Sequence, residues 1–180
     1  MPLIPVGKSL LGRMVDVFGE PADGIGSVNT NVYRSSDISL PDFAVEPGKD
    51  EIMVTGIKVI DLLTPYRKGG KVGLLTYPGT GATVLMMELI NNWAKAYQGH
   101  SVFAKFGERA REVNALHDEM VDSKLIDLEN LETSSVTLVC NQLDDRSQSE
   151  EKANIFLTGF TIAKYFAEEE NRDVLFCLEK

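Results

Sequence analysis

The chain has 180 residues, of which 43% are hydrophobic and 25% are charged, so its length and composition suit one domain with a sizeable core. Its formal net charge of −9 argues against a nucleic-acid partner, because such a partner needs a basic surface that displaces counterions. No apolar run approaches the length of a membrane span, and residues 1–7 form no basic targeting segment, so we expect no direct membrane insertion.

Residues 1–50 contain many turn signals, including Asp23-Gly24 and Pro47-Gly48. Between these signals lies one short strand candidate, at residues 14–18. We interpret this part as a lead-in segment and not as an independent fold.

From about residue 52, strand and helix patterns alternate along the chain. Apolar runs predict strands at residues 71–75, 101–105, 135–140 and 173–178. Apolar residues three or four positions apart predict helices at 82–97 and 110–123, and a third helix that contains 155–166. This alternation predicts an α/β fold with a parallel sheet covered by helices on both faces. A sheet that ends at Lys180 without a following helix would leave one apolar face bare, so we expect either a truncated domain or a domain that a partner completes. We describe it as a single incomplete domain over residues 1–180, with the lead-in at 1–50 and the α/β core at 51–180.

Histidine and cysteine give no metal or disulfide pattern. His100 and His117 have no partners at ligand spacing, which makes a zinc site improbable. Cys140 and Cys177 each lie in a strand-like apolar run, so we expect buried thiols.

Residues 73–83 have the layout of a phosphate-binding loop: an apolar strand, a glycine-rich turn and a helix that opens on a threonine. The pattern of such a loop (P-loop, or Walker A) is G-x-x-x-x-G-K-[ST]. Gly81 and Thr83 match it, but Thr76 replaces the first glycine and Ala82 replaces the lysine. Pro78, inside the turn, also lacks a backbone N–H that could bind phosphate. The sequence therefore predicts a degenerate P-loop.

The missing lysine takes away an ammonium group ~4 Å from a phosphate charge, a loss of roughly 4 kcal/mol at an effective dielectric near 20. The free N–H groups at the start of the helix can still hold phosphate weakly. The candidate phosphate-binding residues are those of the turn and the first helical turn: Gly79, Thr80, Gly81, Ala82, Thr83 and Val84. The alternative is a turn that only connects a strand to a helix. We predict weak or absent nucleotide binding and no catalysis through this loop.

Several strings resemble the rotary ATPases. Residues 55–71 (TGIKVIDLLTPYRKGGK) are similar to the stretch that leads into the phosphate loop of their catalytic subunits. Residues 87–92 (MELINN) and 106–112 (FGERARE) resemble the beta subunit of F-type ATP synthases, and residues 157–166 and 173–176 resemble its following segments, closer to mitochondrial than to plastid versions. The resemblance covers the front half of the family's nucleotide-binding domain. It implies a P-loop NTPase core of the rotary ATPase type, incomplete on its C-terminal side.

The resemblance also implies roles for individual residues. Glu108 lies at the position of the family's water-orienting glutamate, and Arg109 at that of an arginine that meets the γ-phosphate. Thr83 and Glu179 lie at the Mg²⁺-linked positions, where the family binds ATP or ADP with Mg²⁺. The alternative to a catalytic role for Glu108 and Arg109 is that they form an ordinary polar start of the following helix. Lys180 is foreign to the pattern, and its ammonium would compete with Mg²⁺ for the carboxylate of Glu179.

Two functions follow from these patterns. The first is a beta-subunit-like protein of an ATP synthase, in which alpha-type partner subunits complete the site and ATP chemistry is coupled to proton transport, located in mitochondria as the resemblance implies. The second is a diverged, non-catalytic protein that only docks on or regulates synthase subunits, or has no selected function. The acidic stretch at residues 141–151 departs most from the family and should repel phosphate, unless it is only a solvated loop.

Overall fold

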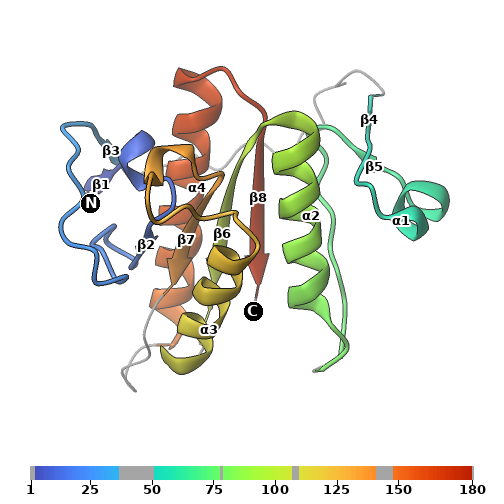
Figure 1. Ribbon diagram of the computed structural model, residues 1–180, viewed down its shortest axis with the longest axis horizontal. Helices are drawn as coiled ribbons and strands as arrows, with labels where there is room; N and C mark the ends of the chain where they lie inside the picture. Colours follow the sequence, from blue (N-terminus) through green and yellow to red (C-terminus); the bar gives the residue numbers. More distant parts are fainter. Residues whose placement is uncertain (1–2, 37–50, 78, 107–109, 141–147, 180) are drawn as a thin grey trace.

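The computed structural model describes residues 3–36, 51–77, 79–106, 110–140 and 148–179. Its centre is a four-stranded parallel sheet in the order β2-β7-β6-β8 (Figure 1). The strands are β2 (Met14–Val15), β7 (Val136–Cys140), β6 (His100–Lys105) and β8 (Val174–Glu179). The predicted parallel α/β sheet is therefore confirmed, and three of its strands lie within one residue of their predicted ranges.

Helices cover both faces of the sheet, as the alternating pattern predicts. The helices are α2 (Ala82–Tyr97), α3 (Ala110–Asp122) and α4 (Gln148–Glu169). On β6, Phe103 packs into the core shared with α2 and α3, whereas Val102 and Ala104 pack into the core shared with α4. This alternation follows from the two-residue period of a strand. At Gly159 of α4 the helix lies so close to the sheet that a Cβ atom would be 2.9 Å from the ring of Phe176.

The lead-in segment contributes to the core and to the sheet. It contains β1 (Leu3–Pro5), the 3-10 helix η1 (Lys8–Leu10), β2 and β3 (Tyr33–Ser35), with β1 and β3 antiparallel. Its apolar side chains fill the core under α4, and the Thr137 hydroxyl donates to the carbonyl of Leu10 at 2.8 Å. The described part of this segment thus packs on residues beyond 100, while the division of the chain at residue 50 stays a prediction.

Residues 51–67 form a small unit ahead of the P-loop-like turn. It consists of β4 (Ile52–Met53), the short helix α1 (Lys58–Leu63) and β5 (Tyr66–Arg67), which pairs antiparallel with β4. The carboxylate of Asp61 accepts hydrogen bonds from the backbone N–H groups of Thr55 and Gly56 at 2.8 and 2.9 Å. A further 3-10 helix, η2 (Leu131–Thr133), precedes β7.

The predicted strand at 71–75 is wrong. Residues 71–77 pair with no strand in the described parts of the chain, and all of them are exposed, with Leu75 entirely so (101%). In Figure 1 this segment descends along the outer side of α2, away from the sheet. An apolar run becomes a strand only when a neighbouring strand takes its backbone hydrogen bonds, and the outer edge of β8 has no described strand beside it.

None of the described helices is both long enough and apolar enough to span a bilayer.

Candidate functional site

The glycine-rich turn leads directly into α2. Gly79 and Gly81 have φ angles of 81° and 91°, in a left-handed backbone region that residues with a Cβ atom rarely adopt. The Thr80 hydroxyl donates to the carbonyl of Tyr77 at 2.7 Å and closes the turn on itself. No side chain caps α2, so its first N–H groups point into the space in front of the helix.

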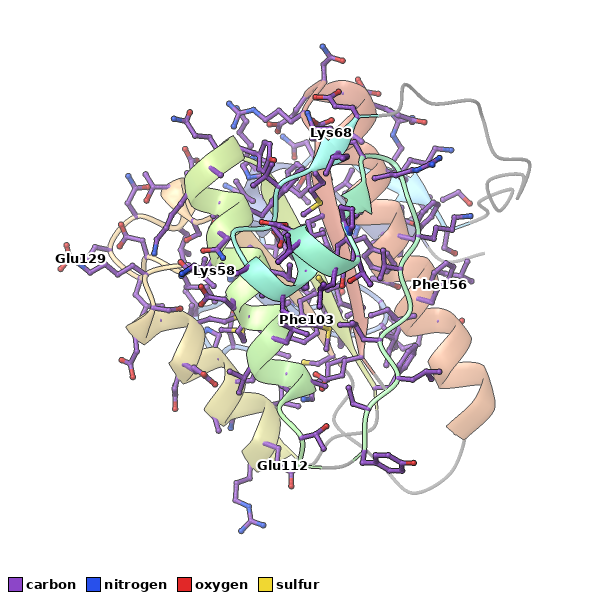
Figure 2. All side chains as sticks on the ribbon, turned by 90° about the vertical axis from the view of Figure 1, so that its right-hand side faces the viewer. Lys58, Lys68, Phe103, Glu112, Glu129 and Phe156 are labelled. Atoms are coloured by element: carbon purple, nitrogen blue, oxygen red, sulfur yellow. The ribbon has the colours of Figure 1, made fainter. Side chains whose placement is uncertain are left out.

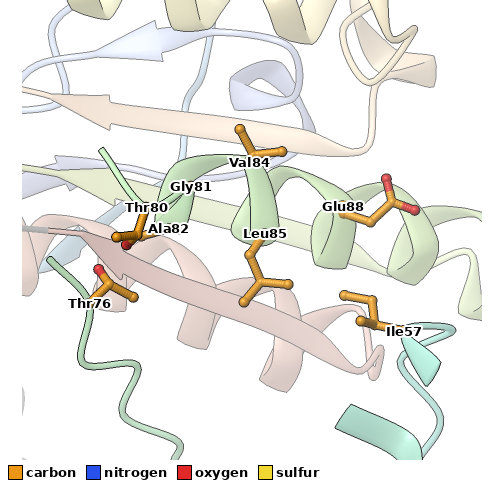
Figure 3. A pocket seen from close by; sticks show the side chains of 8 residues that line it. All are labelled: Ile57, Thr76, Thr80, Gly81, Ala82, Val84, Leu85 and Glu88. Carbon is orange, nitrogen blue, oxygen red and sulfur yellow. The ribbon is translucent and has the colours of Figure 1, made fainter. Parts of the chain in front are cut away.

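A hollow of about 540 Å³ lies beside this helix start (Figure 3). Its described lining is made of methyl, methylene and hydroxyl groups and one carboxylate: Ile57, Thr76, Thr80, Gly81, Ala82, Val84, Leu85 and Glu88. Among these residues Glu88 carries the one charge, and that charge is negative. The methyl group of Ala82 stands where the P-loop pattern has a lysine. Four of the six predicted phosphate-binding residues therefore line this hollow, namely Thr80, Gly81, Ala82 and Val84, whereas Gly79 and Thr83 are not among its described lining residues. The described lining contains no cation.

A second cluster lies at the same end of the sheet, where three elements meet. The Thr83 hydroxyl of α2 donates to Oε1 of Glu179 at 2.5 Å, and the Lys105 ammonium donates to Oε2 of Glu179 at 3.0 Å. Lys105 and Glu179 are paired residues of the neighbouring parallel strands β6 and β8, each at the carboxyl end of its strand. Both side chains are largely buried, with 8% and 14% of their surface exposed.

Sequence reasoning did not select Lys105. It is the last residue of a predicted strand, and the carboxyl ends of parallel strands meet at one edge of a sheet. Its position at the end of a predicted strand could have marked Lys105 as a candidate site residue. The strand register that places it beside Glu179, however, is known only from the folded chain.

Comparison with known proteins decides the family. The model of the nucleotide-binding domain of the ATP synthase alpha/beta family matches residues 56–180. The chain belongs to the ATP synthase alpha/beta family. The structure is also similar to an ATP synthase subunit, NeqB from Nanoarcheaum equitans, with a TM-score of 0.77 and 26% identity. That match covers 97% of this chain and 40% of the NeqB chain, so the chain spans less than half the length of this relative.

The sequence resemblance implies Mg²⁺ at Thr83 and Glu179, and the contact of Glu179 with the Lys105 ammonium does not fit it. Mg²⁺ needs near-octahedral oxygen ligands at about 2.0–2.1 Å. Here one carboxylate oxygen of Glu179 accepts a hydrogen bond from the Lys105 ammonium at 3.0 Å, so a metal ion at this carboxylate would lie beside a fixed positive charge. The other oxygen accepts a hydrogen bond from the Thr83 hydroxyl.

The remaining predicted site residues lie outside the described part of the chain. Glu108 and Arg109 belong to residues 107–109, Lys180 follows the last described residue, and most of the acidic stretch falls at 141–147. Their implied roles in this ATP synthase family member stay predictions.

The two cysteines are buried, as the sequence predicts. Burial raises the pKa of Cys140 and of Cys177 to about 12, with the negative charges of Asp16 and Glu179 as smaller contributions. Both thiols are therefore protonated at neutral pH and serve as core side chains.

Proposed function

We propose that the chain is a beta-subunit-like member of the ATP synthase alpha/beta family that binds nucleotide weakly and does not catalyse ATP synthesis or hydrolysis. One observation carries the proposal: in the hollow beside α2, Ala82 replaces the P-loop lysine and the one charged residue of the described lining is Glu88. A triphosphate in this hollow meets helix N–H groups and one carboxylate, without a cation from these residues.

The expected affinity for nucleotide follows from the missing lysine charge. A single ammonium ~4 Å from a phosphate charge contributes roughly 4 kcal/mol at an effective dielectric near 20, or about a thousandfold in affinity. Nucleotide binding that is micromolar with the lysine therefore becomes about millimolar without it. Phosphoryl chemistry depends on the same positioning charges, so its loss accompanies the loss of affinity.

The assignment to the beta-type branch is supported by the strings at 87–92 and 106–112. In that setting, alpha-type subunits are the partners, and one of them supplies an arginine to the site. Glu108 and Arg109 would then face the nucleotide, and the family role is ATP chemistry coupled to proton transport. The mitochondrial location rests on the resemblance alone.

A second candidate function is docking on synthase subunits without catalysis. It is supported by apolar side chains that the described structure leaves exposed ahead of the turn, namely Val59, Leu62 and Leu63 of α1 and Leu75. Such side chains gain free energy when a partner covers them.

Calorimetric titration of the purified chain with ATP, with and without Mg²⁺, tests the proposal. We expect a dissociation constant of about 1 mM or weaker in both conditions. Titration with inorganic triphosphate separates binding of the phosphates from binding of the base. Micromolar binding of Mg-ATP contradicts the proposal.

Size-exclusion chromatography with purified alpha-type synthase subunits tests the docking candidate. A one-to-one complex that forms without nucleotide supports it. A chain that elutes alone in the presence of these subunits at micromolar concentration contradicts it.

A further inference from the structure

The cluster of Thr83, Lys105 and Glu179 places a built-in cation at the position where a divalent metal is expected. The three side chains come from the first turn of α2 and from the ends of β6 and β8. Both carboxylate oxygens of Glu179 are engaged, one by the Lys105 ammonium at 3.0 Å and one by the Thr83 hydroxyl at 2.5 Å.

The backbone holds this arrangement in place. Lys105 and Glu179 are register partners on adjacent strands, and the ladder continues one step further, because the N–H of Phe106 donates to the carbonyl of Glu179 at 3.0 Å. A buried ammonium is stable only with a charged or strongly polar partner, and Glu179 supplies it. The lysine and the carboxylate are thus held together by the sheet itself and not by a mobile surface contact.

We propose that the Lys105 ammonium takes the place of the divalent cation in this protein, so that the Thr83–Glu179 site excludes Mg²⁺ and any phosphate group bound beside α2 is bound without a metal. A divalent cation bound to this carboxylate would lie close to the Lys105 ammonium, which accounts for part of the negative charge that the metal needs. At an effective dielectric near 20, the repulsion between a single and a double positive charge ~4 Å apart is large enough to weaken metal binding by far more than tenfold.

This inference goes beyond the proposed function, because it concerns the metal and not the nucleotide. It holds whether the chain binds nucleotide weakly or not at all. A nucleotide titration can therefore contradict the proposed function and leave this inference intact, whereas a metal titration without nucleotide tests the inference alone.

Electron paramagnetic resonance with Mn²⁺, which replaces Mg²⁺ at oxygen sites, is the direct test. Free Mn²⁺ is counted during titration of the wild type, Lys105→Met, and Lys105→Met combined with Glu179→Gln. We expect Lys105→Met to raise Mn²⁺ affinity at least about tenfold, because it removes the competing charge and frees one oxygen of Glu179. The double variant should lose that gain, which distinguishes this site from weak binding elsewhere on an acidic chain.

Lys68→Met is the matched control. Lys68 also pairs with a glutamate, Glu51, at 2.7 Å, but this pair is more exposed. Lys68 lies over the ring of Tyr97, the last residue of α2, and so at the opposite end of the helix from Thr83 (Figure 2). Removal of this ammonium should leave Mn²⁺ binding unchanged. An equal gain in Lys68→Met would mean that the effect follows net charge, and it would overturn the proposal.

The wild type decides the question even if Lys105→Met does not fold. A submillimolar Mn²⁺ site in the wild type that Glu179→Gln removes would overturn the proposal, and the absence of such a site supports it. A folded Lys105→Met chain whose Mn²⁺ affinity equals that of the wild type would also overturn it.

Discussion

Restoring the lysine of the P-loop should restore phosphate binding if the rest of the site is intact. Ala82 is the first residue of α2 and is only partly buried, and the hollow of about 540 Å³ beside it has room for a longer side chain. The change Ala82→Lys, made together with Thr76→Gly and Pro78→Ala, returns the cation, the first glycine and one backbone N–H to the turn.

The size of the effect follows from the geometry. An ammonium on a four-carbon stem at position 82 can reach ~4 Å from a phosphate charge, which corresponds to roughly 4 kcal/mol at an effective dielectric near 20. Affinity for triphosphate should therefore rise by up to about a thousandfold. Part of this gain is offset by the carboxylate of Glu88, which lines the same hollow.

Calorimetric titration with inorganic triphosphate at two salt concentrations is the assay. The gain should shrink at high salt, since ions screen an exposed charge pair. Ala82→Met, with Thr76→Gly and Pro78→Ala, is the matched control, because it adds a similar volume without charge. No gain from the lysine variant, or an equal gain from the methionine variant, refutes the electrostatic explanation.

Three further predictions concern stability and are read from urea denaturation. Asp23 forms a buried bidentate ion pair with Arg13 at 2.6 and 2.9 Å. Asp23→Asn should lower the free energy of unfolding by about 3–5 kcal/mol at pH 7. Burial alone would raise the pKa of Asp23, but the hydrogen bonds from Arg13 and the backbone lower it overall. The loss of stability in Asp23→Asn should therefore be largest above about pH 4 and should shrink as the pH falls through the lowered pKa; a loss that grows as the pH falls would contradict the assignment. Burial lowers the pKa of His100, so stability should fall as the pH drops below about 6.5, and His100→Phe should flatten that slope; an unchanged slope would be evidence against it. Gly99→Ala places a Cβ 2.3 Å from Nε1 of Trp93 and should destabilise by about 1–3 kcal/mol, while a neutral result would show that the indole moves freely.

Local patterns predicted the helices because helical hydrogen bonds join residues close in the sequence, and apolar runs predicted three strands of the central sheet. The helix at 82–97 has the predicted bounds. Of its apolar residues at three- or four-residue spacing, Met86, Ile90 and Trp93 are buried and Tyr97 is partly buried. The run at 71–75 has the same local signal as the other strands but stays outside the sheet, since a strand also needs a partner far away in the sequence.

The sequence by itself determined the α/β class, the position of the glycine-rich turn before α2 and the absence of a lysine from that turn, because these depend on residue identity and spacing. Only the tertiary structure decided that Lys105 and Glu179 are paired and that Thr83 donates to the same carboxylate. Lys105 and Glu179 are 74 positions apart in the sequence, and the strand register that pairs them is fixed by how the whole sheet packs between its helices. The fold therefore decides that an ammonium lies beside the carboxylate of Glu179, although Lys105, Glu179 and Thr83 are all visible in the sequence.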